Sequence, residues 1–263
     1  MAFVAGHFGE WMQGRLQPGG PVVLVTLACP AHGVSVERTG DGPLSLEGDP
    51  LVVSSAQAAR MLAEVGLPVA GRYDISADLL PGGGAGMSTA ALVALARAAG
   101  CDDSATLARA CLAVERASDP LMWPTPDRLL WASRRAEIMQ RLDPVPACEI
   151  LGGFWGPPQR TDPEDSDFPD IADLVAAWPG ADLAAKADLA SQSAQRCSSL
   201  RGPVDDPMPE LGKRLGALGH ARAHTGPARA LIFAPGTLPE GAERALTEAG
   251  LSDVLRFATG GGA

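Results

Sequence analysis

The glycine-rich segment 80–90 has the residue types and spacing best suited to chemistry. It reads Leu-Pro-Gly-Gly-Gly-Ala-Gly-Met-Ser-Thr-Ala, and an Ala- and Leu-rich run that predicts a helix follows it. Glycines let the backbone approach an anion closely, and the amides of a first helical turn point toward such a ligand. We therefore predict a phosphate-binding loop made of Gly82, Gly83, Gly84, Ala85, Gly86, Met87, Ser88 and Thr89. The alternative is an ordinary glycine turn in which Ser88 or Thr89 caps the helix.

Two familiar phosphate-binding sequences do not fit this segment. A P-loop requires a lysine before its Ser or Thr, and segment 80–90 contains no lysine. A dinucleotide-binding fingerprint requires Gly or Ala at its sixth position. Counting from Gly82 places Met87 there, and counting from Gly84 places Thr89 there. Both of these nucleotide-binding classes are therefore excluded.

From Gly84 onward the segment resembles the second motif of the GHMP kinase superfamily, P-x-x-x-G-L-G-S-S-A-A. One residue is missing before Gly84, Ala85 replaces the leucine, Met87 replaces the first serine and Thr89 replaces an alanine. Ser88 falls on the second serine, which in this family reaches the metal and the phosphates. The resemblance implies that the loop binds ATP and that Ser88 is a ligand of Mg²⁺.

Segment 7–14, His-Phe-Gly-Glu-Trp-Met-Gln-Gly, resembles the opening motif of the same family. The form G-E-x-x-Q-G is characteristic of the L-threonine kinases of cobalamin synthesis, where it helps to shape the acceptor site. The resemblance implies that Glu10 and Gln13 bind the acceptor substrate. The lysine that often precedes this motif in the family is missing here. A solvated turn is the alternative interpretation of Glu10 and Gln13.

Segment 115–122, Glu-Arg-Ala-Ser-Asp-Pro-Leu-Met, resembles the Glu-Pro-Ser/Thr-Asp segment of the threonine kinases. Two carboxylates at a helix end can divide the work of phosphoryl transfer, which depends mainly on positioning and charge neutralisation. Glu115 would coordinate Mg²⁺, and Asp119 would orient or deprotonate the attacking hydroxyl. Alternatively, Asp119 is a turn residue before Pro120 and Glu115 is a solvated residue at the end of its helix.

Segment 221–230, Ala-Arg-Ala-His-Thr-Gly-Pro-Ala-Arg-Ala, resembles the C-terminal glycine motif of the family. The threonine kinases have A-H-S-G at this place, followed by a strand. The resemblance implies that His224 and Thr225 bind substrate, with His224 donating a hydrogen bond to phosphate or acceptor. A structural hydrogen-bonding histidine is the alternative.

The elements that must position these motifs mix strands and helices. Alternating or β-branched runs predict strands, and capped runs with helical propensity predict helices. The expected strands are 21–28, 33–38, 43–47, 72–79, 228–234 and 253–258, and the expected helices are 54–66, 88–99, 104–116, 129–142, 171–178, 182–200, 210–219 and 239–249. Ser54 and Ser104 are the expected caps of their helices, and the proline-rich acidic segment 156–170 is expected to be a surface loop or a lobe boundary.

This order of elements suits an α+β fold better than a regular βαβ alternation. The family resemblance, which covers nearly the whole chain, implies a GHMP kinase-like two-lobed fold. Residues 1–145 would form an N-terminal, nucleotide-binding lobe of the S5 domain 2-like type. Residues 146–263 would form a C-terminal, ferredoxin-like lobe.

Composition excludes several other functions. The formal net charge of −10 argues against nucleic acid as a partner, because phosphate backbones require a basic surface. No apolar run approaches the ~20 residues that span a bilayer, and residues 1–7 lack the features of a secretion signal, so we expect a cytoplasmic protein with no membrane partner. The five cysteines are scattered and odd in number, which predicts reduced thiols rather than disulfides or zinc ligands.

The leading hypothesis is therefore an L-threonine kinase that uses ATP and Mg²⁺ to form O-phospho-L-threonine for cobalamin synthesis. A second hypothesis keeps the fold and changes the small hydroxyl-bearing substrate to homoserine, a mevalonate-like acid or a sugar. A third is a non-catalytic nucleotide-binding or regulatory relative, which Met87 and the missing lysine favour. The sequence leaves open whether the protein is a homodimer.

Overall fold

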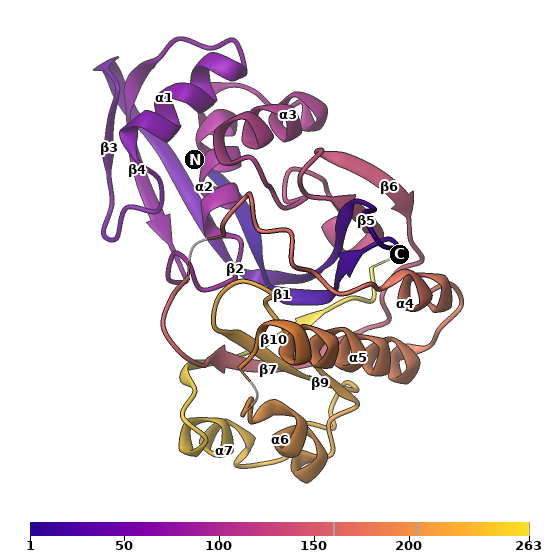
Figure 1. Cartoon of the computed structure of the whole chain (residues 1–263). Coiled ribbons are helices and arrows are strands. Elements are labelled where there is room, and N and C mark those ends of the chain that lie inside the picture. Colours follow the sequence, from indigo (N-terminus) through magenta and orange to yellow (C-terminus); the bar gives the residue numbers. More distant parts are fainter. Residues whose placement is uncertain (160, 204, 263) are drawn as a thin grey trace.

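A single ten-stranded sheet connects the two halves of the chain in the computed structural model, which describes residues 1–159, 161–203 and 205–262. Its strands are β1 (Ala2–Arg15), β2 (Val22–Pro43), β3 (Ser45–Glu47), β4 (Ala70–Ala77), β5 (Leu129–Ala132), β6 (Glu137–Arg141), β7 (Cys148–Phe154), β8 (Gly219–Arg222), β9 (Ala228–Phe233) and β10 (Ser252–Thr259). The main path runs β10-β7-β9-β8-β1-β2-β4-β3, and β5 extends it by pairing with β2 and β6. The α+β class predicted from the sequence is thus confirmed (Figure 1).

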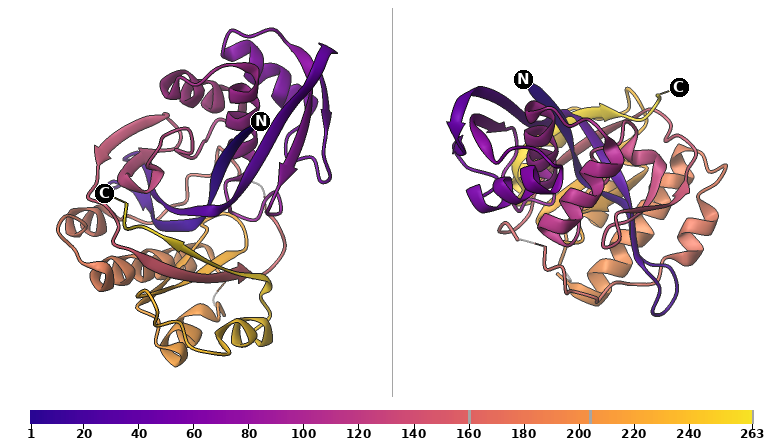
Figure 2. Two further views of the ribbon diagram at one scale, coloured as in Figure 1. Left: turned by 180° about the vertical axis from the view of Figure 1, so that it is seen from behind. Right: turned by 90° about the horizontal axis from the view of Figure 1, so that it is seen from above.

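Helices pack at both ends of this sheet, as Figure 1 and the left view of Figure 2 show. Helices α1 and α3 lie at the end that holds β3 and β4, and α6 and α7 lie at the opposite end. The helices are α1 (Ser55–Glu64), α2 (Met87–Ala99), α3 (Ser104–Glu115), the 3₁₀ turn η1 (Pro126–Arg128), α4 (Ala172–Ala177), α5 (Leu183–Arg201), α6 (Met208–Leu215) and α7 (Ala242–Glu248). In the described residues, no helix is long and apolar enough to cross a membrane. The predicted lobe boundary between residues 145 and 146 stays a prediction.

Helix α2 is the central helix of the N-terminal half. It packs on β1 and β2, and every residue from Ala90 to Ala96 is fully buried. A helix covered on all sides needs an apolar residue at nearly every position, which explains its run of Ala, Leu and Val. The start of α2 is therefore held firmly at the end of the glycine-rich segment.

Successive residues along β7 and β9 face opposite sides of the sheet. Ile150 and Ile232 belong to the main core, whereas Leu151 and Leu231 join α6 and α7 in a second apolar cluster. The C-terminal half is thus a sheet with apolar packing on both faces.

Of the two predicted helix caps, one is confirmed and the other is wrong. Ser54 caps α1 through a reciprocal capping box with Gln57, so this prediction is confirmed. Ser104 was the expected cap of α3, but Asp103 takes that place and accepts a hydrogen bond from the Thr106 amide. The Ser104 hydroxyl donates instead to the carbonyl of Met122. Because the Asp103 carboxylate already accepts from the free amide of the first turn, the Ser104 hydroxyl is available for this tertiary contact.

The helix expected over 129–142 is wrong. This segment forms β5, a turn, and β6, with Trp131 of β5 opposite Leu24 of β2. The indole of Trp131 is fully buried and donates a hydrogen bond to the Ser118 carbonyl at 2.7 Å. Burial of this large side chain and pairing with β2 outweigh a helix propensity that differs by only tenths of a kcal/mol per residue. Strands β1, β7 and β8 have no counterpart among the expected elements.

Two glycine-containing loops pack directly on each other where the two halves meet. The loop after β4 and the loop between β8 and β9 are joined by a hydrogen bond from the Ala228 amide to the Gly83 carbonyl at 2.9 Å. Gly84 has φ of +78°, and a Cβ there would lie 2.3 Å from the Cβ of Ala223. Gly226 has φ of +100°, and a Cβ there would lie 2.7 Å from the Gly84 nitrogen. Glycine at these positions thus allows the loops to touch.

We predict that Gly84→Ala destabilises the protein far more than Gly66→Ala. Both glycines have left-handed φ, but a Cβ at Gly66 meets nothing within 4 Å. Left-handed strain costs about 1 kcal/mol at either site, and overpacking against Ala223 adds about 2 kcal/mol at Gly84. Urea unfolding of the two variants measures the difference, and equal midpoints would contradict the close packing of the loops.

Candidate active site

A cavity of about 350 Å³ lies beside the glycine-rich loop and the N-terminus of α2. All of the site residues predicted from the sequence line it except Gly83 and His224. His7, Arg134 and Phe168, which are not among the predicted site residues, also line it. A larger hollow of about 600 Å³ beside Gln192 and Arg196 of α5 contains no glycine loop and none of the predicted site residues. The 350 Å³ cavity is therefore the candidate active site, although the role of each residue stays a prediction.

The glycine-rich loop is held against β1 by backbone hydrogen bonds. The His7 amide donates to the Ala85 carbonyl and the Gly9 amide donates to the Gly84 carbonyl, both at 3.1 Å. Gly82, Gly84 and Gly86 have φ of +76°, +78° and +70°, a region that residues with a Cβ rarely adopt. The run of glycines therefore permits the tight path of the loop.

The N-terminus of α2 opens into this cavity. Gly86 is the N-cap residue, no side chain caps the helix, and its first turn contains no acidic residue. The expectation that Ser88 or Thr89 merely caps the helix is therefore wrong. The amides of this turn and the helix dipole favour an anion at this end.

Glu115 accepts hydrogen bonds from the two hydroxyls at the start of α2. The Ser88 hydroxyl donates to Glu115 Oε1, and the Thr89 hydroxyl donates to Oε2 at 2.8 Å. Burial raises the pKa of Glu115 from its ordinary 4.5 to about 7; the two hydrogen bonds oppose this shift and the Asp119 charge adds to it. Glu115 is thus a partly buried acid held at the start of α2 rather than a solvated helix end.

Asp119 follows the end of α3, where Arg116 has a left-handed φ of +64° and turns the chain back toward α2. One of its oxygens, Oδ2, lies 3.2 Å from Nε2 of His7. Its amide donates a long hydrogen bond of 3.5 Å to the Thr89 hydroxyl. Asp119 therefore lies on the cavity wall next to Glu115 and close to the start of α2.

A bulge in β1 lets both His7 and Glu10 face the cavity. Residues an odd number of positions apart normally face opposite sides of a strand. The pairing with β2 passes from His7 opposite Ala28 to Glu10 opposite Thr26, which leaves one extra residue in β1. Gly9 supplies the left-handed φ of +74° at this point. The alternative of a solvated turn for Glu10 and Gln13 is wrong, because both residues belong to β1.

His224 lies behind the cavity wall rather than on it. Its amide donates to Glu10 Oε2 at 3.2 Å, its Nδ1 lies 3.5 Å from the same oxygen, and its ring stacks on Phe168. Burial lowers the pKa of His224, but Cys197 and Glu10 more than offset this effect and raise it to about 9. The contacts of His224 thus orient Glu10 and Phe168, while the neighbouring Thr225 reaches the cavity.

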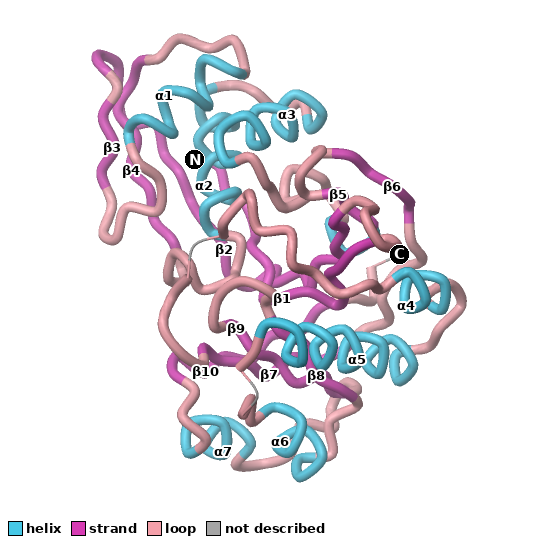
Figure 3. The backbone as a smooth tube through the Cα atoms, viewed as in Figure 1, coloured by secondary structure: helices cyan, strands magenta, loops and turns pink. Residues whose placement is uncertain are grey.

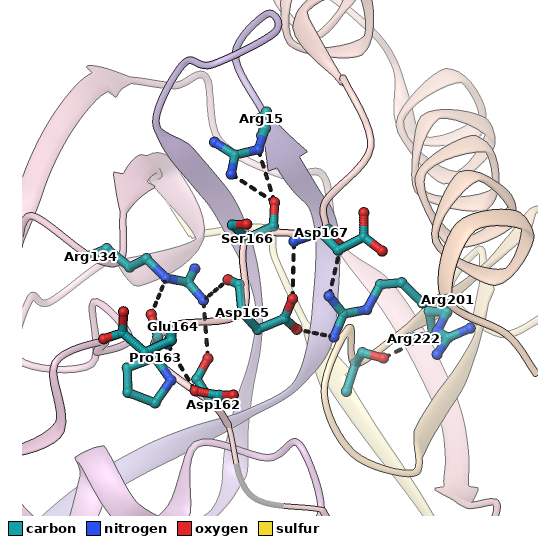
Figure 4. Close-up of polar contacts among 11 residues, drawn as sticks. Arg15, Arg134, Asp162, Pro163, Glu164, Asp165, Ser166, Asp167, Arg201 and Arg222 are labelled. Carbon is teal, nitrogen blue, oxygen red and sulfur yellow. Dashed lines mark hydrogen bonds and ion pairs between the residues drawn. The ribbon is translucent and has the colours of Figure 1, made fainter.

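Three arginines hold the acidic loop that covers one side of the cavity (Figure 4). Figure 3 shows residues 161–170 as a loop that leads across the molecule to α4. Arg15 donates to the Ser166 carbonyl, Arg134 donates to the carbonyls of residues 162, 163 and 165, and Arg201 pairs with Asp165. Phe168 of this loop lies beneath the guanidinium groups of Arg134 and Arg201. The surface loop expected over 156–170 is confirmed for its described residues, and it forms a wall of the candidate site.

The donors beside α2 fit Mg²⁺ in their chemistry. Mg²⁺ prefers hard oxygen ligands and usually keeps several waters while it shares substrate phosphates with one or two carboxylates. The Ser88 hydroxyl and the Glu115 carboxylate are such oxygens, and they already lie in contact. Across the described residues, no cluster of three or more His, Cys, Asp or Glu side chains could hold a metal by itself. The site thus suits a metal that arrives with a nucleotide rather than a permanently caged ion.

The sequence offers different signals for the three unpredicted cavity residues, His7, Arg134 and Phe168. His7 belongs to the same short motif as Glu10, but strand alternation would have placed it on the other face. Arg134 lies in the segment that was expected to be helical, and its position depends on the β5–β6 turn. Phe168 is one apolar residue within an acidic loop, and no local pattern indicates that it reaches the cavity.

Comparison with known proteins identifies the fold. No protein-family model and no curated protein matches the sequence. Solved structures do match over nearly their full lengths. A mevalonate kinase is 12% identical with a TM-score of 0.62, over 98% of this chain and 97% of its own. The L. major mevalonate kinase in complex with R-mevalonate is also 12% identical with a TM-score of 0.62, over 98% and 94%.

A putative homoserine kinase from Listeria monocytogenes is 15% identical with a TM-score of 0.60, over 99% of this chain and 98% of its own. These likenesses confirm the predicted GHMP kinase-like fold. The identities are low, so they establish the architecture and leave the chemistry of this chain to its own residues.

The raised pKa of Glu115 predicts a specific pH dependence of stability. The folded state binds this proton more tightly than the unfolded chain does, so its contribution is complete below pH 4.5 and is lost as the pH rises through about 7. Glu115→Gln should remove about 3 kcal/mol of this pH dependence. Urea unfolding between pH 4 and 8 in EDTA measures it, with Glu64→Gln, at an exposed carboxylate of α1, as the control. Parallel pH curves for wild type and Glu115→Gln would contradict the burial of this acid.

Proposed function

We propose that this protein is an ATP-dependent kinase that phosphorylates the hydroxyl of L-threonine to give O-phospho-L-threonine. The observation that carries the proposal is one cavity in which uncapped amides of α2 lie next to two carboxylates, Glu115 and Asp119. Anion-binding amides and neighbouring acids are the two components that phosphoryl transfer requires. The shared fold with mevalonate and homoserine kinases supports the same reaction class.

In this reaction the residues 82–89 bind the triphosphate through backbone amides. The acceptor oxygen attacks the γ-phosphorus in line, the bond between that phosphorus and the bridging oxygen to the β-phosphate breaks, and ADP leaves. The hydroxyl proton passes to Asp119 and then to solvent. Mg²⁺, held by Ser88 and Glu115 together with the nucleotide, would neutralise charge on the phosphates.

Opposite charges on the cavity wall support an amino-acid acceptor. Glu10 is a buried carboxylate that faces the cavity and suits an ammonium group. Arg134 lines the same cavity and suits a carboxylate, and its described hydrogen bonds use Nε and Nη2 rather than Nη1. The G-E-x-x-Q-G form of the first motif further supports threonine and a place in cobalamin synthesis.

Homoserine is the second candidate, because it carries the same two charged groups with its hydroxyl one carbon farther away. A mevalonate-like acid would use Arg134 without Glu10, and a sugar would use neither charge. Met87, which replaces a serine in the loop, favours a non-catalytic relative. Against this alternative, the Ser88 and Thr89 hydroxyls are both kept in contact with Glu115.

The proposal predicts ADP release from Mg-ATP in the presence of L-threonine, measured by a coupled assay over a panel of hydroxyl acceptors. Asp119→Asn should reduce kcat by about 10²-fold or more and change ATP affinity by less than about twofold, because Asp119 acts on the acceptor. Asp41→Asn, at a highly exposed carboxylate, is the control. Absence of ADP release with every acceptor, together with absence of Mg-ATP binding in calorimetry of folded protein, would favour the non-catalytic alternative.

A second prediction separates amino-acid acceptors from others. Arg134→Gln should raise the KM for L-threonine by about 10-fold or more, because a charged hydrogen bond contributes about 1.5–3 kcal/mol. The KM for ATP should change little. Arg15→Gln is the matched control, since Arg15 also bonds the acidic loop but does not line the cavity. Equal effects of the two variants would indicate that Arg134 only holds the loop.

A further inference from the structure

A buried histidine, His7, and a partly buried acid, Asp119, form a pair at the wall of the candidate active-site cavity. His7 Nε2 lies 3.2 Å from Asp119 Oδ2, and the two side chains are 4% and 25% exposed. On the other side of the ring, Nδ1 lies 3.2 Å from the Gly9 carbonyl oxygen. The imidazole is therefore held at both nitrogens, by a strand carbonyl and by the proposed catalytic acid.

The two partners of the ring determine its charge. A carbonyl oxygen only accepts hydrogen bonds, so Nδ1 must carry a proton. A carboxylate that has lost its proton also only accepts, so the 3.2 Å contact of Nε2 with Asp119 Oδ2 is attractive when Nε2 carries a proton as well. A histidine that donates from both nitrogens is an imidazolium. His7 and Asp119 thus form an ion pair with a defined direction.

The surroundings of His7 leave the ring little freedom. A Cβ on Gly86 would lie 2.4 Å from His7 Cδ2, so the ring packs directly on the turn that starts α2. The charged groups that face the ring are Asp119 at the end of α3 and Glu10 on β1 itself. In the described part of the chain, no other cationic side chain lies within ion-pair distance of Asp119.

We propose that His7 is a positioning residue for phosphoryl transfer: its imidazolium binds Asp119 Oδ2 and leaves Oδ1 directed toward the acceptor hydroxyl. This inference rests on the proposed kinase function. His7 does not itself act as the base, because both of its nitrogens already donate. Its contribution is to hold the carboxylate in one orientation and to offset the charge of Glu10 and Asp119 on the same wall.

The titration of His7 supports this arrangement. Burial lowers the pKa of His7, but Asp119, Glu10 and the Gly9 carbonyl more than offset this effect and raise it to about 9. The imidazolium is thus present across the neutral range and is lost as the pH rises through about 9. His224, which faces Glu10 from the other side, titrates in the same region, so the two histidines must be distinguished by mutation.

A double-mutant cycle tests the proposal. We expect His7→Ala to lower kcat by about 10²-fold with less than about a threefold change in the KM for ATP, because a misplaced base costs about this much. In the Asp119→Asn background the same substitution should change kcat by less than about threefold, since His7 acts through Asp119. His7→Lys, which retains a cation, should recover at least about a tenth of wild-type kcat. His220→Gln, outside the cavity, is the control.

Imidazole NMR provides a readout that does not depend on activity. The His7 resonance, assigned by its loss in His7→Ala, should titrate with a pKa that falls by more than about one unit in Asp119→Asn. An unchanged His7 pKa in this variant, or an equal effect of His7→Ala with and without Asp119, overturns the proposal while leaving the kinase function intact. Wild-type protein that releases no ADP with any acceptor overturns the proposed function first and this inference with it.

Discussion

The active site depends on the pairing of β1 with the glycine-rich loop. Two backbone hydrogen bonds, from the amides of His7 and Gly9, hold the loop at the edge of β1. The same strand pairs with β2 and β8, so it connects the N-terminal and C-terminal parts of the sheet. Because the glycine-rich loop bonds to the same short stretch of β1 that carries the bulge at Gly9 and the side chain of Glu10, a change in this strand would move the loop and Glu10 together.

Burial of charge gives the site its chemical character. An uncapped helix N-terminus faces three carboxylates, Glu10, Glu115 and Asp119, around one cavity. Each acid has a specific partner that makes its burial tolerable: the amide of His224, the hydroxyls of α2, and the ring of His7, respectively. The cavity can therefore keep these acids beside the positive end of a helix dipole without relying on lysine, which is scarce in this chain.

The acidic loop 161–170 completes the site from the C-terminal side. Its backbone carbonyls accept from arginines that come from β1, the β5–β6 turn and α5. Phe168 packs against two of these guanidinium groups and against His224. A segment with an acidic, proline-rich sequence is thus held by cations from distant parts of the chain, and one of them, Arg134, also lines the cavity.

Local sequence determined the glycine-rich loop, the helix that follows it, the acids at the end of α3 and the α+β class. These features depend on glycine conformation, helix propensity, capping and alternation, which act over a few neighbouring residues. Tertiary structure alone decided that 129–142 pairs as strands, that a bulge directs both His7 and Glu10 into the cavity, and that Arg134 and Phe168 reach it. Each of these outcomes depends on contacts between segments far apart in the chain, where strand register and burial of large side chains outweigh local preference.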